Sequence, residues 1–114
     1  MFGPNFKEID ARELAGWLAD ENRDFRMIDV REPQELMQGS IPGVEAMPLS
    51  SLGNRLGEID RERPVVFICR SGARSGQVCA YLAQNGYENV INLRGGVIGW
   101  AQSGFQFEAV SQIA

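Results

Sequence analysis

Apolar residues along this chain gather in short continuous runs, which are separated by amphipathic stretches and by turns. The clearest run is Val65-Val66-Phe67-Ile68, which is typical of a parallel strand with both faces buried. A second run, Val90-Ile91-Asn92-Leu93, predicts the last strand of the chain. Residues 6–9, 25–29 and 44–47 predict three more short strands, the first of them at an edge of the sheet.

The longest amphipathic stretch comes soon after residues 65–68. It predicts a helix over residues 75–85, because four residues fall on one side at helical spacing: Val78, Cys79, Tyr81 and Leu82. Gly86 then predicts a left-handed residue that ends the helix. The segment 69–74 therefore joins the end of a buried strand to the start of a helix.

Shorter helices are predicted between the other strands. Residues 10–13 read Asp-Ala-Arg-Glu, a capping box that opens a helix with these residues facing inward: Leu14, Trp17 and Leu18. Residues 49–57 predict a short irregular helix despite Gly53, and residues 97–103 predict a final short helix.

One further short helix is predicted to begin at Pro33, because proline suits the first position of a helix. Its apolar surface is expected from Leu36 and Met37, with Glu35 and Gln38 in solvent. Gly39 ends this helix before the turn signal at residues 41–43.

Strands alternate with helices over the whole length, which predicts a three-layer α/β domain with a mainly parallel central sheet flanked by helices. The length of 114 residues predicts one domain, residues 1–114. Ligands of such sheets bind beyond the carboxyl ends of the strands. We therefore expect three loops to meet at one edge: the loop after Asp29, the loop that starts at Cys69, and Arg94-Gly95-Gly96.

Composition narrows the chemistry. Eleven basic residues against 15 acidic ones give a net charge of −4, which argues against nucleic acid or an anionic membrane as a partner. The chain has no histidine, which excludes a Cys-His pair, a Ser-His-Asp triad and a histidine-ligated metal. Two cysteines without histidine are also poor ligands for zinc, so we expect no metal. Positive charge is expected locally at Arg70 and Arg74, which have no carboxylate between them.

Residues 1–5 lack a basic region followed by an apolar segment, and no apolar run reaches membrane-spanning length. The chain has two cysteines, Cys69 and Cys79, which are predicted to lie in different environments and to stay reduced. A cytoplasmic location is therefore expected. Cys79 is interpreted as a core residue beside Val78 and Leu82, with a resolving thiol as the alternative.

The stretch Cys69-Arg70-Ser71-Gly72-Ala73-Arg74-Ser75 carries the candidate chemistry. Successive amides in such a loop, together with the N-terminus of the next helix, form a cradle for an anion. An unperturbed thiol of pKa about 8.5 is only about 3% thiolate at pH 7, and lowering it by about two units makes it about three-quarters thiolate. We therefore expect Cys69 to be a nucleophile of lowered pKa.

The alternative for Cys69 is a small core residue, which is the usual role of a lone cysteine at the end of a buried strand. The polar residues that follow it favour the catalytic interpretation, because they form cores poorly and bind anions well. Gly72 also permits the positive φ that a tight loop lined by amides requires.

Several motifs, taken together and in this order, resemble the rhodanese family. They are Asp29-Val30-Arg31-Glu32-Pro33, Gly39-Ser40-Ile41-Pro42-Gly43, the segment from Cys69 to Ser75, Leu93-Arg94-Gly95-Gly96, and Trp100. The resemblance spans most of the chain, whose length is similar to that of the small single-domain thiosulfate sulfurtransferases. One departure is Ser40, where many members carry histidine; we expect it to affect only the surface.

The resemblance implies that Cys69 takes a sulfane sulfur from a small anionic donor such as thiosulfate and holds it as a persulfide. The acceptor would be cyanide or a thiol, including a protein thiol, and no cofactor is implied. The loop residues would bind the substrate: Arg70, Ser71, Gly72, Ala73, Arg74 and Ser75. The Arg74 side chain, helped by Arg70, would bind the sulfonate, because guanidinium suits such an oxyanion.

Three further residues of the motifs have supporting roles in this interpretation. Asp29 and Arg31 are expected to hold neighbouring loops in place through ion pairs rather than to touch sulfur. Trp100 is expected either in the core or in the wall of a pocket.

Two rival functions stay open from the sequence. A phosphatase related to rhodanese also places a cysteine and an arginine in one loop, but with five residues between them, whereas four separate Cys69 from Arg74. A persulfide carrier or a regulatory interaction module would keep the same fold and the same cysteine.

Overall fold

The computed structural model of the chain describes residues 6–111. The expectation of no targeting segment at residues 1–5 concerns residues outside that range. Within it, no helix combines the length and the apolar character that crossing a membrane requires.

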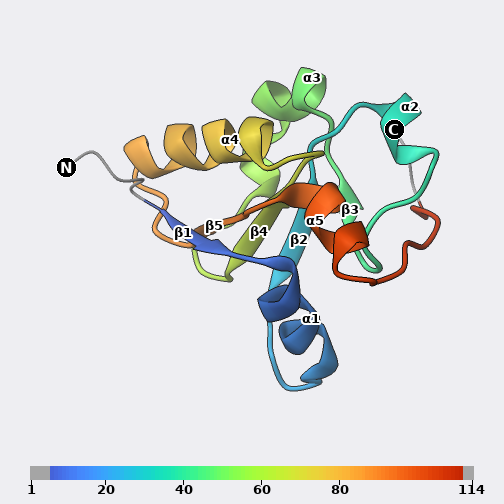
Figure 1. The fold of residues 1–114 in the computed structure, drawn as a ribbon. Coiled ribbons are helices and arrows are strands. Elements are labelled where there is room, and N and C mark those ends of the chain that lie inside the picture. The colour runs from blue at the N-terminus through green and yellow to red at the C-terminus, as the bar shows by residue number, and fades with distance from the viewer. Residues whose placement is uncertain (1–5, 112–114) are drawn as a thin grey trace.

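Five parallel strands form the central sheet, in the order β1-β5-β4-β2-β3 (Figure 1). They are β1 (Lys7–Ile9), β2 (Arg26–Asp29), β3 (Glu45–Ala46), β4 (Val65–Ile68) and β5 (Val90–Leu93). Both β4 and β5 are buried along their whole length, as their apolar runs predict. The predicted parallel sheet, with β1 at an edge, is confirmed.

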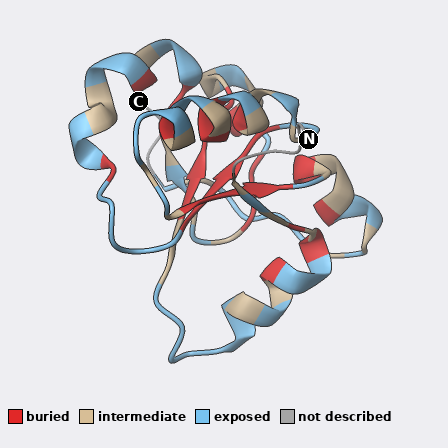
Figure 2. Cartoon of the chain, turned by 90° about the vertical axis from the view of Figure 1, so that its left-hand side faces the viewer, coloured by how far each residue is buried: buried red, intermediate tan, exposed pale blue. Residues whose placement is uncertain are grey.

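Helices cover both faces of this sheet and complete the three predicted layers (Figure 1). One face carries α3 (Leu49–Leu52), the 3₁₀ helix η1 (Gly53–Glu58) and α4 (Ala73–Gln84). The other face carries α1 (Ala11–Ala19) and α5 (Gly96–Gln102), and α2 (Pro33–Leu36) lies beyond the end of β2. Figure 2 shows the buried residues along the strands and on the helix sides that face them.

The helix signals are largely confirmed. Asp10 and Glu13 form the capping box of α1, and Pro33 is the first residue of α2. Gly86 has a φ of +90°, the left-handed conformation expected after α4. That helix begins at Ala73, two residues before the predicted start, because Gly72 with a φ of +99° already serves as its N-cap.

Three side chains that were predicted to face inward are exposed: Leu18, Met37 and Tyr81, at 37%, 76% and 54%. Each residue of a helix turns the side-chain direction by about 100°. Tyr81 and Met37 each stand one position from a fully buried leucine, at Leu82 and Leu36, and are therefore rotated out of the contact. Leu18 lies in the last turn of α1, one turn beyond buried Leu14.

Candidate active site

Cys69 directly follows β4 at the carboxyl edge of the sheet and is 1% exposed. Its Sγ accepts a hydrogen bond from the backbone N–H of Gly72 at 3.1 Å, and the Ser75 hydroxyl oxygen lies 3.4 Å away. The loop therefore wraps around the sulfur and turns hydrogen-bond donors toward it.

Two glycines give the loop this shape. Gly72 has the predicted positive φ, and a Cβ there would lie only 3.1 Å from the carbonyl oxygen of Leu93. A Cβ on Gly96 would lie 2.4 Å from the carbonyl oxygen of Arg70, so only glycine fits. The loop that starts at Cys69 thus packs directly against residues 93–96.

The amino end of α5 also binds this loop through backbone hydrogen bonds. The N–H of Val97 donates to the Cys69 carbonyl at 3.0 Å, and the N–H of Ile98 donates to the Arg70 carbonyl at 3.1 Å. These bonds tie the loop after β5 to the cysteine loop, two of the three loops expected at this edge.

The hydrogen bonds to the sulfur decide its ionisation. Burial raises the pKa of the Cys69 thiol, but hydrogen bonds from the Ser75 hydroxyl and from the backbone of Ser75, Gly72 and Ser71 outweigh burial and leave the pKa lowered. The lowered pKa of Cys69 agrees in direction with the expectation, and it results from hydrogen-bond donors within the loop and the first turn of α4.

Arg74 does not extend freely over the loop. Its guanidinium forms a two-pronged ion pair with Glu35 of α2, with both N–O distances 3.0 Å. Glu35, which was expected in solvent, therefore neutralises one of the two cations of the loop. This pair also links α2 to α4 across the site.

The ion pair of Glu35 is expected to make a contribution to the free energy of unfolding that is lost in acid. The hydrogen bond from Arg74 lowers its pKa from 4.5 to about 2, so its contribution is complete above about pH 4.5 and fades as the pH falls toward 2. Because both side chains are about one-third exposed, we expect only about 1 kcal/mol from the pair.

Urea unfolding of the wild type and of Glu35→Gln, measured from pH 7 to pH 2, tests this expectation. The difference in unfolding free energy should hold down to about pH 5 and then shrink. Glu88→Gln, which removes an exposed carboxylate that forms no ion pair among residues 6–111, is the matched control. A Glu35→Gln difference that is the same at both ends of the range would contradict the ion-pair account.

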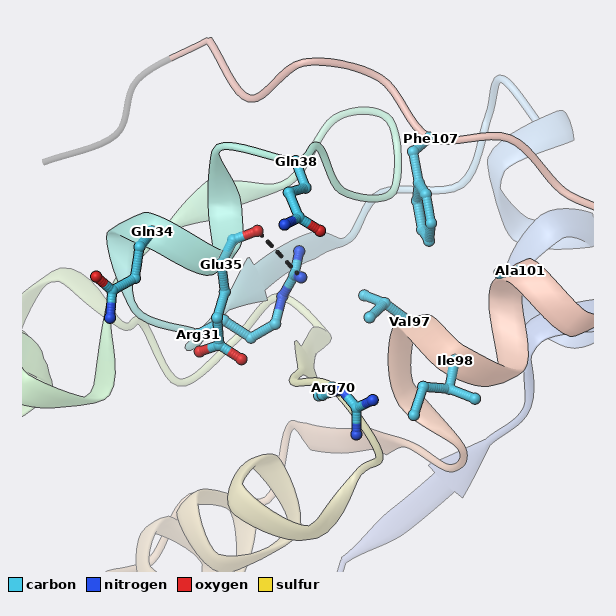
Figure 3. A pocket seen from close by; sticks show the side chains of 9 residues that line it. All are labelled: Arg31, Gln34, Glu35, Gln38, Arg70, Val97, Ile98, Ala101 and Phe107. Atoms are coloured by element: carbon cyan, nitrogen blue, oxygen red, sulfur yellow. Dashed lines mark hydrogen bonds between the residues drawn. The ribbon is translucent and has the colours of Figure 1, made fainter.

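Arg70 is the exposed cation of the loop, and no ion pair to it is found among residues 6–111. It lines a pocket of about 560 Å³ between α2 and α5 (Figure 3). The other lining residues are Arg31, Gln34, Glu35, Gln38, Val97, Ile98, Ala101 and Phe107. The pocket thus offers a cation, two amide side chains and an apolar wall beside the cysteine loop.

Asp29 and Arg31 form a buried ion pair below this pocket, as expected. The N–O distance is 2.9 Å, and the Asp29 side chain is fully buried. The Arg31 guanidinium also donates to the Gly39 carbonyl oxygen at 2.9 Å. It donates as well to the Glu35 carbonyl oxygen at 3.4 Å (Figure 3). This pair holds the turn of α2 and the loop behind it.

Ser40 was expected to affect only the surface, and this is wrong. The residue is fully buried, and its hydroxyl donates to Asp29 at 2.6 Å. Its backbone exchanges two hydrogen bonds of 2.9 Å with Glu108, which brings the C-terminal segment and Phe107 to the pocket. A small hydroxyl side chain thus belongs to the Asp29 cluster.

Trp100 and Cys79 belong to the core. Trp100 is 4% exposed, packs against Phe105 and donates its indole N–H to the carbonyl oxygen of Gln106 at 2.9 Å. It does not line the pocket. Cys79 is fully buried, and burial raises the pKa of its thiol to about 12, so it is a poor resolving thiol.

The sequence reasoning missed two polar residues near the loop, Glu35 and Asn92. Asn92 interrupts the apolar run of β5, and its side chain contacts Ser75. An amide within a strand that is otherwise entirely apolar was the available signal. No group of three metal-binding side chains occurs in the described part of the chain.

Comparisons with known proteins agree with this geometry. The model of the Rhodanese-like domain family matches residues 10–103. A protein named sulfurtransferase from Allochromatium vinosum is 48% identical over 102 residues, which cover 90% of this chain and 94% of that protein. A thiosulfate sulfurtransferase from Pseudoalteromonas translucida is 30% identical, over 83% of this chain and 89% of its own.

Among solved structures, the crystal structure of a rhodanese-related protein from Thermoplasma volcanium is similar to this fold. It has a TM-score of 0.81 and 28% identity, and the match covers 92% of this chain and all of the other. The family match, the relatives and the shared fold show that this chain belongs to the rhodanese-like domain family of sulfurtransferases.

Proposed function

We propose that this chain moves a sulfane sulfur from thiosulfate, or a similar small anionic donor, through a persulfide on Cys69 to a thiophilic acceptor such as cyanide or a thiol. The observation that carries the proposal is the Cys69 sulfur held at the end of β4 by a ring of hydrogen-bond donors. The relative named thiosulfate sulfurtransferase supports the choice of donor.

The chemistry needs only groups that the loop offers. The Cys69 thiolate attacks the outer sulfur of thiosulfate, the S–S bond breaks, and sulfite leaves with the electron pair. The acceptor then attacks the outer sulfur of the persulfide and restores the thiolate, so cyanide gives thiocyanate. Because sulfite leaves as a stable anion, no general acid is needed, which suits a chain without histidine.

Arg70 is the better candidate for the sulfonate of the donor. It lines the pocket and has no ion pair among the described residues, whereas Arg74 already holds Glu35. The loop from Ser71 to Ser75 would surround the persulfide, with backbone N–H groups as donors to its sulfur. Arg74 then serves mainly to fix α2 against the loop.

The pocket beside the loop bears on the acceptor. A volume of about 560 Å³ is far more than cyanide needs, and its lining includes exposed Phe107 as well as polar Gln34 and Gln38. This supports an organic thiol, including the thiol of a partner protein, which would make the chain a persulfide carrier. Both cysteines are free, which supports a reducing compartment such as the cytoplasm.

Arg70→Ala tests how the donor is bound. A lost charge-assisted hydrogen bond at an exposed site is worth about 1.5 kcal/mol, so we expect the KM for thiosulfate to rise about tenfold with little change in kcat. Steady-state formation of thiocyanate measures both constants. Arg94→Ala, which removes an exposed arginine of the neighbouring loop, should leave them unchanged.

If Arg74→Ala raised the KM and Arg70→Ala did not, the sulfonate would bind at Arg74 instead. An aryl phosphate assay on the wild type addresses the phosphatase alternative, and we expect no turnover. Turnover of the phosphate ester without transfer of sulfur would reject the proposed function.

A further inference from the structure

Asn92 is a buried amide within β5, a strand whose other residues are apolar. It is 2% exposed within β5, and all its side-chain hydrogen-bonding groups have partners. The Nδ2 amide donates to a Glu8 carboxylate oxygen at 2.9 Å and to the Gly72 carbonyl at 3.1 Å. Its Oδ1 lies 2.6 Å from the Ser75 hydroxyl oxygen.

These partners fix the direction of the Asn92 amide. A carboxylate and a backbone carbonyl only accept hydrogen bonds, so the NH₂ group must face Glu8 and Gly72. Glu8 is directly opposite Asn92 in the register of β1 and β5. Gly76 of α4 leaves the space for the amide, because a Cβ there would lie 3.3 Å from Nδ2. The Oδ1 oxygen therefore faces Ser75.

Ser75 then has one proton and two acceptors for it. The hydroxyl can donate to Asn92 Oδ1 at 2.6 Å or to Cys69 Sγ at 3.4 Å, but not to both at once. While Cys69 is a neutral thiol, the Ser75 hydroxyl can donate its hydrogen bond to Asn92 Oδ1. When Cys69 ionises, the Ser75 hydroxyl turns to donate its hydrogen bond to the thiolate sulfur. Asn92 Oδ1 is then left buried without a hydrogen-bond donor.

We propose that Asn92 is a positioning residue that competes with Cys69 for the Ser75 proton and thereby limits how much reactive thiolate the loop holds. The proposal rests on the proposed function, in which that thiolate attacks the sulfur donor. Asn92 itself does not touch the reacting sulfur and acts only through Ser75.

The hydrogen bond from Asn92 to the Gly72 carbonyl does not contribute to this competition for the Ser75 proton. The Gly72 carbonyl also accepts the N–H of Gly76 at 3.0 Å, so it keeps a partner when Asn92 is replaced. The Gly72 N–H that donates to the sulfur therefore stays in place. Replacing Asn92 by an apolar residue should free the Ser75 proton and leave the other donors unchanged.

The charged and titratable groups around Cys69 are all retained in such a variant, and Glu8 alone among them loses a hydrogen bond, the one from Asn92 Nδ2. They are Glu8 on β1, Asp29 and Arg31 at the end of β2, Glu35 on α2, Arg70 in the loop, and Arg74 and Cys79 on α4. None of these groups is removed by the substitution. An effect transmitted through Glu8 would persist without the Ser75 hydroxyl, whereas the proposed effect requires that hydroxyl.

The test is the pH dependence of Cys69 alkylation by iodoacetamide, measured without a sulfur donor or an acceptor. In Asn92→Leu we expect the titration midpoint to fall by about one pH unit, from the restored hydrogen bond to the thiolate. Asn92→Val removes the same oxygen and serves as a second variant. Asn89→Leu removes an amide whose NH₂ donates to the carbonyl oxygens of Asp60 and Arg63 in the loop before β4, and it should leave the midpoint unchanged.

A Ser75→Ala background completes the test. There the midpoint should be higher than in the wild type, and adding Asn92→Leu should no longer move it. A midpoint that rises or stays fixed in Asn92→Leu and Asn92→Val, or an equal fall without Ser75, would overturn the proposal. Because no sulfur donor is present, this result is separate from any failure to transfer sulfur.

Discussion

Replacing Cys69 by serine is expected to abolish sulfur transfer while the fold is kept. The hydroxyl occupies nearly the same space, can accept the hydrogen bond of Gly72, and leaves the buried strand before it intact. A serine cannot form a persulfide, so neither step of the proposed transfer can take place. Thiocyanate formation should fall to the rate without enzyme, and the unfolding free energy should change by about 1 kcal/mol or less.

Cys79→Ser is the matched control for this variant. The Cys79 thiol is fully buried against the sheet, so the substitution is expected to reduce stability modestly and leave transfer near normal. Transfer that persists in Cys69→Ser would refute the persulfide mechanism. Transfer that is lost in a folded Cys79→Ser would instead make that residue a resolving thiol.

Asp29→Ala is expected to have the largest effect on stability. The Asp29 carboxylate is fully buried and accepts hydrogen bonds from the Arg31 guanidinium, the Arg31 N–H and the Ser40 hydroxyl. Removing it leaves a guanidinium that is 8% exposed without its counter-ion. Such an uncompensated buried charge costs about 3–5 kcal/mol, a large part of the stability of an ordinary domain.

Urea unfolding at pH 7 measures this loss. Asp24→Ala is the control, because Asp24 pairs with Arg63 at 2.8 Å but is 72% exposed, and about 1 kcal/mol or less is expected there. Equal effects of the two substitutions would show that the buried pair contributes no more than a surface pair. In that case the loop after β2 must be held by other contacts.

The sequence predicted the architecture because its signals are local. Four consecutive apolar residues in Val65–Ile68 mark a strand buried on both faces, and Asp10 and Glu13 mark a helix start without reference to the rest of the chain. The cysteine loop was predicted in the same way, since the polar residues around Gly72 form cores poorly and bind anions well at the end of a buried strand.

Side-chain partners from distant parts of the chain were not predicted. Glu35 and Arg74 are 39 positions apart, and Glu8 and Asn92 are 84 positions apart. Which of the several exposed carboxylates meets a given arginine depends on how α2 packs beside the loop, and no local pattern encodes this. The burial of Ser40 has the same origin, because it depends on the C-terminal segment at Glu108.

The most direct test of the central claim is the intact mass of the wild type and of Cys69→Ser after incubation with thiosulfate and removal of the excess. We expect the wild type to gain the mass of one sulfur atom, to lose it again when cyanide is added, and the variant to gain nothing. A wild type that gains no sulfur, or a variant that gains as much, would contradict a persulfide on Cys69.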